Sequence, residues 1–341
     1  MRDLCGILLR RFGSLVALTC SVSDESECIV TFNQNLGDSS GRAQGGGNSG
    51  GSNFGGGNRG GGNFLINMLV SQVGARFGLP GIIIAGLVIF FLNSGGGIPG
   101  IGGGGANNVQ GPQTDSDALA HCKTYEDANK HDDCRIQATA TVLDDFWGEA
   151  LPQEANIQYT KPGLFIGSGQ INTACGAADA SQSGPFYCPG DETVYFATPF
   201  FKQLRQMGGS DGSFAQMYVV AHEFGHHIQQ LEGNLGLSDY NNPGEDSNAV
   251  KMELQADCYA GLWASQADKG PDAMLDPITQ DQVDQAVKTA QSIGDDAIQK
   301  SAGRSVNPEK WTHGSSQQRV DAFLRGYQGG TMASCEANFR R

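Results

Sequence analysis

The stretch that most constrains what this chain can fold into runs from Val219 to Gln229 and reads VVAHEFGHHIQ. It is a mostly apolar, helix-favouring run that carries two histidines, His222 and His226, four positions apart. Because residues four apart on a helix point the same way, both imidazoles can bind one metal ion. Glu223 lies about 100° further round the helix, which places it beside the ion, in the position of a base. The stretch therefore predicts a zinc site.

A carboxylate pair further along the chain completes the predicted site. A catalytic zinc ion usually has three protein ligands, so two histidines leave one position to fill. A second helix is expected over residues 248–263, and it carries Glu253 and, one turn later, Asp257. We predict that Glu253 is the third zinc ligand. Asp257 faces the same way and is predicted to accept the outer N–H of His222, which would fix the tautomer of that ligand.

The first helix is expected over residues 213–231, with Ser213 as its N-cap. Gly225 lies inside this helix, although glycine destabilises a helix by about 1 kcal/mol relative to alanine. A glycine here indicates that a neighbouring element packs closely against the helix. His227 is rotated away from the ligand face and is predicted to be packed or hydrogen-bonded rather than bound to metal.

Charge is distributed unevenly along the chain. Residues 113–341, which we take as the globular domain, carry 16 basic and 31 acidic side chains, whereas residues 1–112 carry six and five. An acidic domain of this kind repels phosphate backbones. We therefore do not expect nucleic acid as a partner.

The N-terminal third has a different composition, because 25 of the 50 glycines fall between residues 37 and 105. A Gly/Asn/Ser-rich run at residues 37–62 has nothing to bury, so residues 1–76 are predicted to be a disordered, low-complexity region that contains a flexible linker. A phosphate-binding loop is the alternative, but the run lacks a following Lys-Ser/Thr and a preceding strand. Residues 1–20 fit either a short signal peptide or a cytoplasmic tail.

An uncharged apolar stretch, residues 77–93, approaches the ~20 residues that a helix needs to cross a membrane. A buried core helix is the alternative, but the low-complexity sequence on both sides, including a second Gly-rich linker at residues 94–112, could not cover it. Arg59 and Arg76 precede the stretch, and no Lys or Arg follows until Lys123. By the positive-inside rule we predict a single-pass cell-membrane protein with a cytoplasmic N-terminus and the globular domain outside.

Six cysteines lie beyond the apolar stretch, an even number that suits disulfides in an oxidising compartment. Closeness along the chain favours three pairs: Cys122 with Cys134, Cys175 with Cys188, and Cys258 with Cys335. The sequence alone does not determine this connectivity. A metal held by His121, Cys122, His131 and Cys134 is an alternative, although the spacing matches no familiar zinc motif.

The remaining pattern indicates an α+β domain that is mostly helical with a small sheet. An amphipathic helix is expected over residues 136–150, and further helices over residues 280–298 and after Ser316. Short strands are expected at residues 157–159, 164–166 and 193–196. The last of these could be an edge strand that pairs with an extended peptide, or an ordinary core strand. An all-helical fold is the alternative.

Four separated motifs together resemble a bacterial family, the putative neutral zinc metallopeptidases: AHEFGHHIQ, ELQADCYAGLW, CGAADASQSGPFYCPGDETVYF and THGSSQQRVDAFLRGY. The resemblance covers residues 113–341 and the order of a Gly-rich N-terminus and one membrane span. It implies a membrane-anchored protein with a zincin-like metallopeptidase fold. It also implies that His222, His226 and Glu253 bind one zinc ion and that Glu223 is the catalytic base. The N-terminus is longer than the family pattern, so residues 1–38 have no interpretation.

The carbonyl that such a site attacks needs a group that stabilises negative charge on its oxygen. His313, just ahead of the last expected helix, is the candidate, and Tyr327 and Arg319 are rivals. Each role has a structural alternative, because His313 could brace the last helix and Arg319 could pair with a carboxylate.

These residues predict a zinc-dependent metalloendopeptidase that cleaves protein or peptide substrates. Zinc lowers the pKa of a bound water molecule, from which Glu223 takes a proton that it later gives to the leaving amine. A non-catalytic, zinc-stabilised binding module of the envelope is the alternative, and a metal-free tethered scaffold is a third. A closed structural site would more often use four Cys or His ligands, which favours the enzyme.

Overall fold

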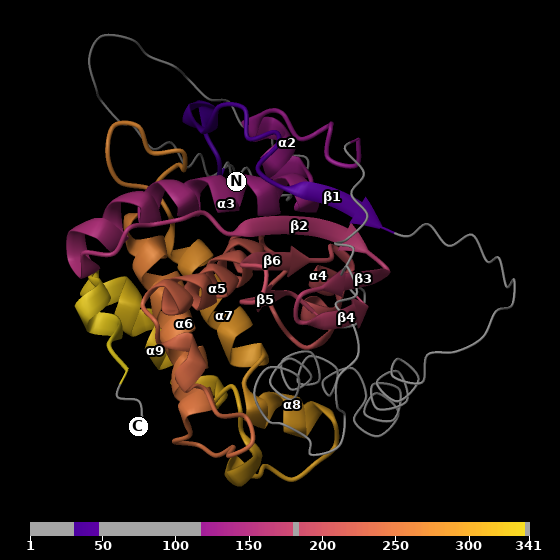
Figure 1. Ribbon diagram of the computed structural model, residues 1–341, viewed down its shortest axis with the longest axis vertical. Coiled ribbons are helices and arrows are strands. Elements are labelled where there is room, and N and C mark those ends of the chain that lie inside the picture. Colours follow the sequence, from indigo (N-terminus) through magenta and orange to yellow (C-terminus); the bar gives the residue numbers. More distant parts are fainter. Residues whose placement is uncertain (1–30, 48–116, 180–183, 338–341) are drawn as a thin grey trace, which may run out of the picture. The chain divides into compact units, whose positions relative to one another are not determined.

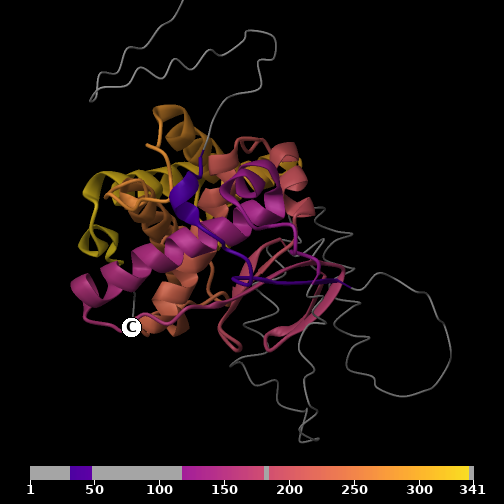
Figure 2. The ribbon, with the colours of Figure 1, turned by 90° about the horizontal axis from the view of Figure 1, so that it is seen from above.

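The computed structural model describes residues 31–47, 117–179 and 184–337, which hold a small sheet beside a larger group of helices (Figure 1). Seen from above, the strands gather on one side of the helices (Figure 2). The helices are α2 (Tyr125–Lys130), α3 (Asp132–Ala150), α4 (Pro199–Gln206), α5 (Ser213–Leu231), α6 (Asn248–Gln266), α7 (Gln280–Ser292), α8 (Asp295–Ser301) and α9 (Ser316–Gly329). The strands are β1 (Gln44–Gly47), β2 (Gly163–Ser168), β3 (Gln170–Thr173), β4 (Gly176–Asp179), β5 (Phe186–Cys188) and β6 (Thr193–Phe196). The prediction of a mostly helical α+β domain is confirmed.

Four strands form a mixed sheet in the order β1-β2-β6-β5. β1 and β6 run parallel to β2, whereas β5 runs antiparallel to β6. β2 and β6 contain the strands predicted at residues 164–166 and 193–196. Because β6 lies inside the sheet, the suggestion that it is an edge strand is wrong, and β5 is the outer strand at that end. β3 and β4 pair with each other as a separate hairpin.

The strand predicted at residues 157–159 does not form. These residues follow Asn156, whose left-handed conformation (φ 56°) ends the preceding helical turn. Their apolar pattern has another cause, because Tyr159 is buried and its hydroxyl donates to Asp144 Oδ1 at 2.8 Å. The segment is therefore a buried connection rather than a strand.

α5 is the central helix and packs against α3, α6 and α7. The close packing that was predicted at Gly225 is provided by α6, since a Cβ on this glycine would lie 2.9 Å from the Cα of Ala256. The side chains of Val220, Phe224 and Ile228 on α5 are fully buried. Burial of this apolar face stabilises α5 within the domain, and the close approach of the two backbones at Gly225 holds α5 against α6.

The helix predicted over residues 280–298 is two helices, α7 and α8, so the prediction of one continuous helix is wrong. The break falls at Ile293 and Gly294, although the apolar spacing continues across it. A Cβ on Gly294 would lie 2.2 Å from the backbone nitrogen of Ser316, so a side chain is excluded there. The break lets the start of α8 pack against the loop that precedes α9.

All three favoured disulfides are present: Cys122–Cys134, Cys175–Cys188 and Cys258–Cys335. The first joins the loop before α2 to α3, and the second joins the β3–β4 turn to β5. The third spans 77 residues and fixes the C-terminal segment to α6. Each bond removes conformations from the unfolded chain and so stabilises the folded one.

Thr31–Gly47 packs with the globular domain, whereas the prediction placed these residues in a disordered region and began the domain at residue 113. Phe32 is fully buried and forms a β-bridge with Leu275. Arg42 donates to both carboxylate oxygens of Asp144 on α3, and its guanidinium lies 5.7 Å from the ring centre of Phe224 on α5. Gln44–Gly47 has few side chains to bury, but its backbone pairs with β2.

Within residues 31–47, 117–179 and 184–337, no helix is long and apolar enough to span a bilayer. The predicted span at residues 77–93 and the linker at residues 94–112 lie outside the described residues. Residues 1–30, with the signal-peptide alternative, lie outside them as well.

Candidate metal centre

Three proposed ligands converge between α5 and α6. His222 and His226 lie one turn apart on α5, and Glu253 faces them from α6. Nε2 of His222 is 3.3 Å from one carboxylate oxygen of Glu253, and Nε2 of His226 is 3.7 Å from the other. Ligands at ~2.0 Å from a tetrahedral zinc ion lie about 3.3 Å apart. Two imidazoles and one carboxylate at these separations therefore fit a zinc ion.

Both histidines are held through their outer ring nitrogens. Nδ1 of His222 lies 2.8 Å from Oδ1 of Asp257, as predicted, and Nδ1 of His226 lies 2.9 Å from Oε1 of Gln229. The amide of Gln229 is oriented in turn, because its nitrogen donates to the carbonyl oxygen of Met252 at 2.7 Å. Acceptors at Nδ1 leave both Nε2 atoms to face Glu253, where a metal ion would bind.

Asp257 is the centre of a buried polar network. It accepts the hydroxyl of Tyr218, at 2.5 Å, and two N–H groups of Arg319, each at 2.9 Å. Burial alone would raise the pKa of Asp257, but Arg319 and His222 outweigh it and hold the pKa below its usual value. Asp257 is therefore a carboxylate that orients His222.

Arg319 lines the site but is committed to Asp257. The geometry agrees with the alternative in which Arg319 pairs with a carboxylate. Tyr327, the other rival for charge stabilisation, is not among the residues that line the cavity; it stacks on Phe323, with ring centres 6.2 Å apart. Of the three candidates, His313 has the most suitable position.

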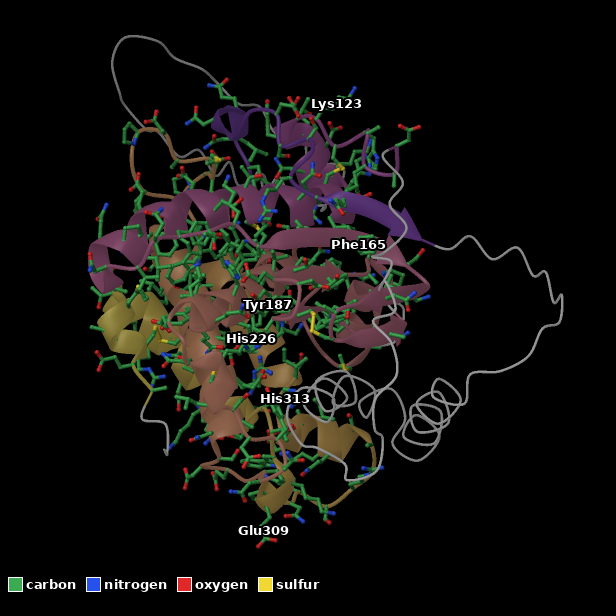
Figure 3. The ribbon with its side chains drawn as sticks, viewed as in Figure 1. Lys123, Phe165, Tyr187, His226, Glu309 and His313 are labelled. Carbon is green, nitrogen blue, oxygen red and sulfur yellow. A yellow bond between two sulfur atoms is a disulfide. The ribbon has the colours of Figure 1, made fainter. Side chains whose placement is uncertain are left out.

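His313 reaches the site from the loop before α9. Its side chain is buried, and its Nε2 atom has no hydrogen-bond partner among the described residues. It lines the same cavity as Glu223 and the three proposed ligands, and Figure 3 shows His226 and His313 in this part of the molecule. Burial would lower the pKa of His313, but the charges of Glu253 and Asp295 outweigh it and raise the pKa.

Glu223 is almost completely buried beside the proposed ligands. Burial raises the pKa of its carboxyl, while His222 and His226 act in the opposite direction. A raised pKa brings a carboxylate nearer to the range in which it can both accept and return a proton at neutral pH. The position and the environment of Glu223 therefore suit a base.

The cavity itself has a volume of about 60 Å³, room for an ion and a few water molecules. Its remaining walls are mostly apolar: Pro185, Phe186, Phe200, Val219, Ile293 and Ile298. Apolar walls exclude bulk water, so charges inside the cavity interact more strongly than they would at the surface.

Tyr240 and Asp295 are among the residues of the site that sequence reasoning did not find. Tyr240, in the connection between α5 and α6, donates its hydroxyl to Oε1 of Glu253 at 3.1 Å. Asp295, at the start of α8, binds the loop that carries His313. Neither residue lies at a helical spacing from His222 or His226, so no local sequence pattern indicates its role.

His227 lies outside the ligand set, as predicted. Its Nδ1 is 2.9 Å from the hydroxyl of Tyr187, and its Nε2 is 2.6 Å from the carbonyl oxygen of Thr160. Both ring nitrogens are thus used by structural partners, and burial lowers the pKa of the ring.

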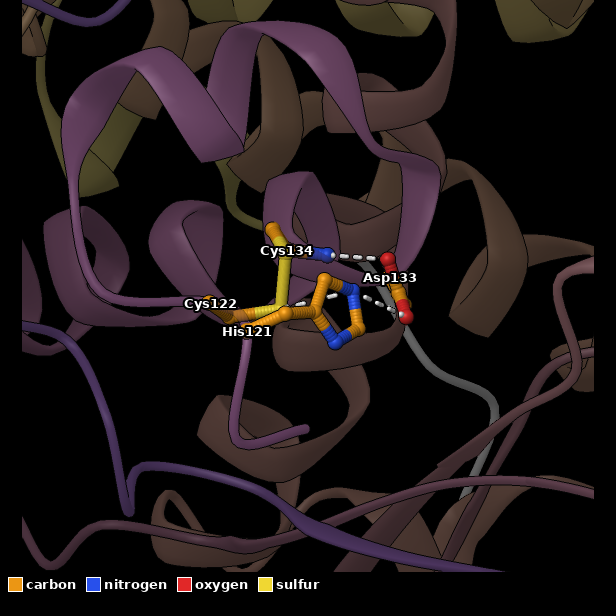
Figure 4. A group of neighbouring side chains, drawn as sticks. All are labelled: His121, Cys122, Asp133 and Cys134. Carbon is orange, nitrogen blue, oxygen red and sulfur yellow. Dashed lines mark hydrogen bonds and ion pairs between the residues drawn. A yellow bond between two sulfur atoms is a disulfide. The ribbon is translucent and has the colours of Figure 1, made fainter. Parts of the chain in front are cut away.

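A second cluster, at His121, Cys122, Asp133 and Cys134, brings possible metal ligands together (Figure 4). The two sulfur atoms form a disulfide, however, so they are not thiolates that could bind a metal. His121 instead lies 3.1 Å from a carboxylate oxygen of Asp133. The structure therefore supports the disulfide rather than the alternative metal site at these residues.

The chain is similar to known proteins over most of the described residues. A family model described as "Putative neutral zinc metallopeptidase" matches residues 35–338. The uncharacterized protein Rv2575 of Mycobacterium tuberculosis is 44% identical over 224 residues, which are 64% of this chain and 74% of that protein. The uncharacterized protein YpfJ of Escherichia coli K12 is 38% identical over 214 residues, 60% of this chain and 72% of that protein. No solved structure matches the chain.

Proposed function

Because this chain belongs to the putative neutral zinc metallopeptidase family, we propose that it is a zinc-dependent metalloendopeptidase that hydrolyses peptide bonds in protein substrates. One observation carries the proposal. His222, His226 and Glu253 converge in one buried cavity, and Glu223 lines that cavity beside them. This set would hold a single zinc ion and leave a position for water. The central helix beside a small sheet also supports a zincin-like arrangement.

Each group has a separate task in the proposed reaction. Zinc supplies a Lewis acid that lowers the pKa of a water molecule. Glu223 would accept a proton from the attacking water as the water oxygen bonds to the carbonyl carbon, and would pass the proton to the amine when the C–N bond breaks. His313 lines the cavity, and a protonated ring would donate from Nε2 to the carbonyl oxygen as that oxygen becomes negative. Asp257 and Gln229 keep the two histidine ligands in place.

We further propose that the substrate binds as an extended peptide along β5. β5 is the outer strand of the sheet, and Pro185 and Phe186 at its start line the cavity. A peptide that pairs with a sheet edge is held by main-chain hydrogen bonds, while pockets select its side chains. The apolar walls formed by Phe200 and Val219 favour substrates with an apolar side chain next to the cleaved bond.

The decisive experiment compares the full chain with its Glu223→Gln variant in a proteomic cleavage screen. Glu223 is not a proposed ligand, so the variant should keep zinc, measured by elemental analysis, and lose at least about 100-fold in cleavage rate. Glu149→Gln, an exposed change on α3, should cleave normally. Identical peptide profiles for the wild type and Glu223→Gln, with zinc in both, would favour the non-catalytic binding module.

We propose that the globular domain lies outside the cytoplasm. Three disulfides support this location, since such bonds persist in oxidising compartments and are rare in the cytosol. Membrane attachment through residues 77–93 remains a prediction.

The position of Thr31–Gly47 supports a topology that differs from the predicted one. These residues precede the predicted span, yet β1 pairs with β2, and Phe32 pairs with Leu275. A helix that crossed the membrane once at residues 77–93 would place the paired residues on opposite sides. The pairing and a single crossing therefore exclude one another. We propose that Thr31–Gly47 and the residues from 117 onward share one side of the membrane, outside the cytoplasm.

A further inference from the structure

Asp295, the first residue of α8, holds the loop that carries His313. Its Oδ2 atom accepts three consecutive backbone N–H groups, from Thr312 at 2.8 Å, His313 at 2.7 Å and Gly314 at 3.1 Å. Its own N–H donates to the carbonyl oxygen of Gly314 at 2.8 Å. A carboxylate that is almost fully buried and accepts three N–H groups in a row fixes the path of this loop.

The second oxygen of Asp295 contacts the ring itself. Oδ1 lies 3.3 Å from Nδ1 of His313, and the hydroxyl of Thr312 lies 3.0 Å from the same nitrogen. An ionised carboxylate only accepts hydrogen bonds, so this contact requires a proton on Nδ1. The ring is then oriented with Nε2 pointing away from Asp295.

Nε2 of His313 is left without a partner among the described residues, although it is buried. A buried nitrogen without a hydrogen bond costs free energy and calls for an explanation. The cavity that His313 lines is also lined by Glu223 and Glu253, so a substrate oxygen in this cavity is a suitable partner.

We propose that Asp295 is a positioning residue for the hydrolytic reaction: it orients the ring of His313 and holds a proton on Nδ1, so that the doubly protonated ring donates from Nε2 to the substrate oxygen. This inference rests on the proposed peptidase function. It assigns a role to the break between α7 and α8, because that break places Asp295 beneath the loop. Asp295 itself touches neither the substrate nor the metal.

The neighbouring residue Asp296 provides a matched control. It accepts the backbone N–H and the hydroxyl of Ser316, both at 2.7 Å, and so holds the other end of the same loop. Within the part of the chain that the structure describes, its side chain bonds to Ser316 and Lys300 and not to the ring of His313. Asp295→Asn keeps an oxygen for the backbone N–H groups but offers an amide to the ring. Asp296→Asn disturbs the loop without changing the acceptor at Nδ1.

The test measures kcat and KM for the full-length, zinc-loaded chain on one peptide found in the cleavage screen. We expect Asp295→Asn to lower kcat by roughly 10- to 100-fold with KM nearly unchanged, and Asp296→Asn to change kcat by less than about threefold. In a His313→Ala background, Asp295→Asn should cause no further loss, because it acts through the ring that is already missing. Equal losses in the two Asn variants, or losses that multiply with His313→Ala, would overturn the proposal.

A second measurement is made on the wild-type chain and uses a variant only to assign signals. The ¹⁵N spectrum of the histidine rings in the wild-type, zinc-loaded chain shows which ring nitrogens carry protons, and His313→Ala identifies the signals of His313. The proposal requires a protonated Nδ1; an unprotonated Nδ1 would overturn it. If the wild type cleaves no peptide, the proposed function fails, but this spectrum still decides whether Asp295 fixes the ring.

Discussion

The guanidinium of Arg319 pairs with the carboxylate of Asp257, and both side chains are buried. Removing one member of a buried ion pair leaves the other charge without compensation. We expect Arg319→Met to destabilise the protein by about 3–5 kcal/mol, measured as the free energy of unfolding in denaturant.

Arg325, on the exposed side of the same helix, is the control for this prediction. Arg325→Met should change the free energy of unfolding by no more than about 0.5 kcal/mol. Similar losses in the two variants would show that the pair with Asp257 is not the source of the effect.

The residues of the site differ in how far the sequence indicates them. His222, Glu223 and His226 are separated by fixed helical spacings, so one helix prediction places all three. Glu253 and Asp257 needed only a second helix packed on the first. Tyr240 and Asp295 reach the site through tertiary packing, and no periodic pattern connects them to the motif.

The helices and strands also differ in how far the sequence indicates them. α5 and α6 were predictable because long amphipathic patterns determine where apolar faces lie, and Gly225 indicated their close contact. β1 was missed because a Gly-rich run has no side-chain pattern, and its pairing depends on hydrogen bonds to a strand far along the chain. The break at Gly294 was missed because it is imposed by Ser316, which lies outside any local window.

The contact between α5 and α6 can be tested at Gly225. A Cβ there would lie 2.9 Å from the Cα of Ala256, so the two helices must separate slightly. We expect Gly225→Ala to destabilise the protein by roughly 1–3 kcal/mol, and to weaken zinc binding because Glu253 moves away from the histidines. Unfolding curves and competition with a chelator measure the two effects.

Gly148 on α3 provides the opposite case, since a Cβ there meets nothing within 4 Å. Gly148→Ala should stabilise the protein by about 0.5–1 kcal/mol through helix propensity alone. If Gly225→Ala also stabilised the protein, close packing would not be the reason for glycine at that position.

At the scale of the whole molecule, cysteine labelling can test whether Thr31–Gly47 and the residues from 117 onward lie on the same side of the membrane. Ser40 and Glu309 are both exposed. Each is replaced by cysteine in a full chain whose Cys5, Cys20 and Cys28 are serine, and intact cells are treated with a membrane-impermeant maleimide. We expect Ser40→Cys and Glu309→Cys to react equally.

Permeabilised cells provide the control, because both positions should then react. Labelling of Glu309→Cys alone in intact cells would establish a single crossing between the two positions and would contradict the pairing of β1 with β2. If neither cysteine is labelled in intact cells, the domain lies in the cytoplasm. The two positions would then still lie on the same side of the membrane.

The pairing of β1 with β2 also has a consequence for biosynthesis. Gln44 pairs with Phe165, 121 positions later. At about 5–20 residues per second, a ribosome needs roughly 6–24 s to make that interval. During this delay the first strand of the sheet exists without its partner, and closing so long a loop is slow. Assembly of the sheet must therefore wait for the second half of the chain, and a chaperone that shields the early strand would increase the yield of folded protein.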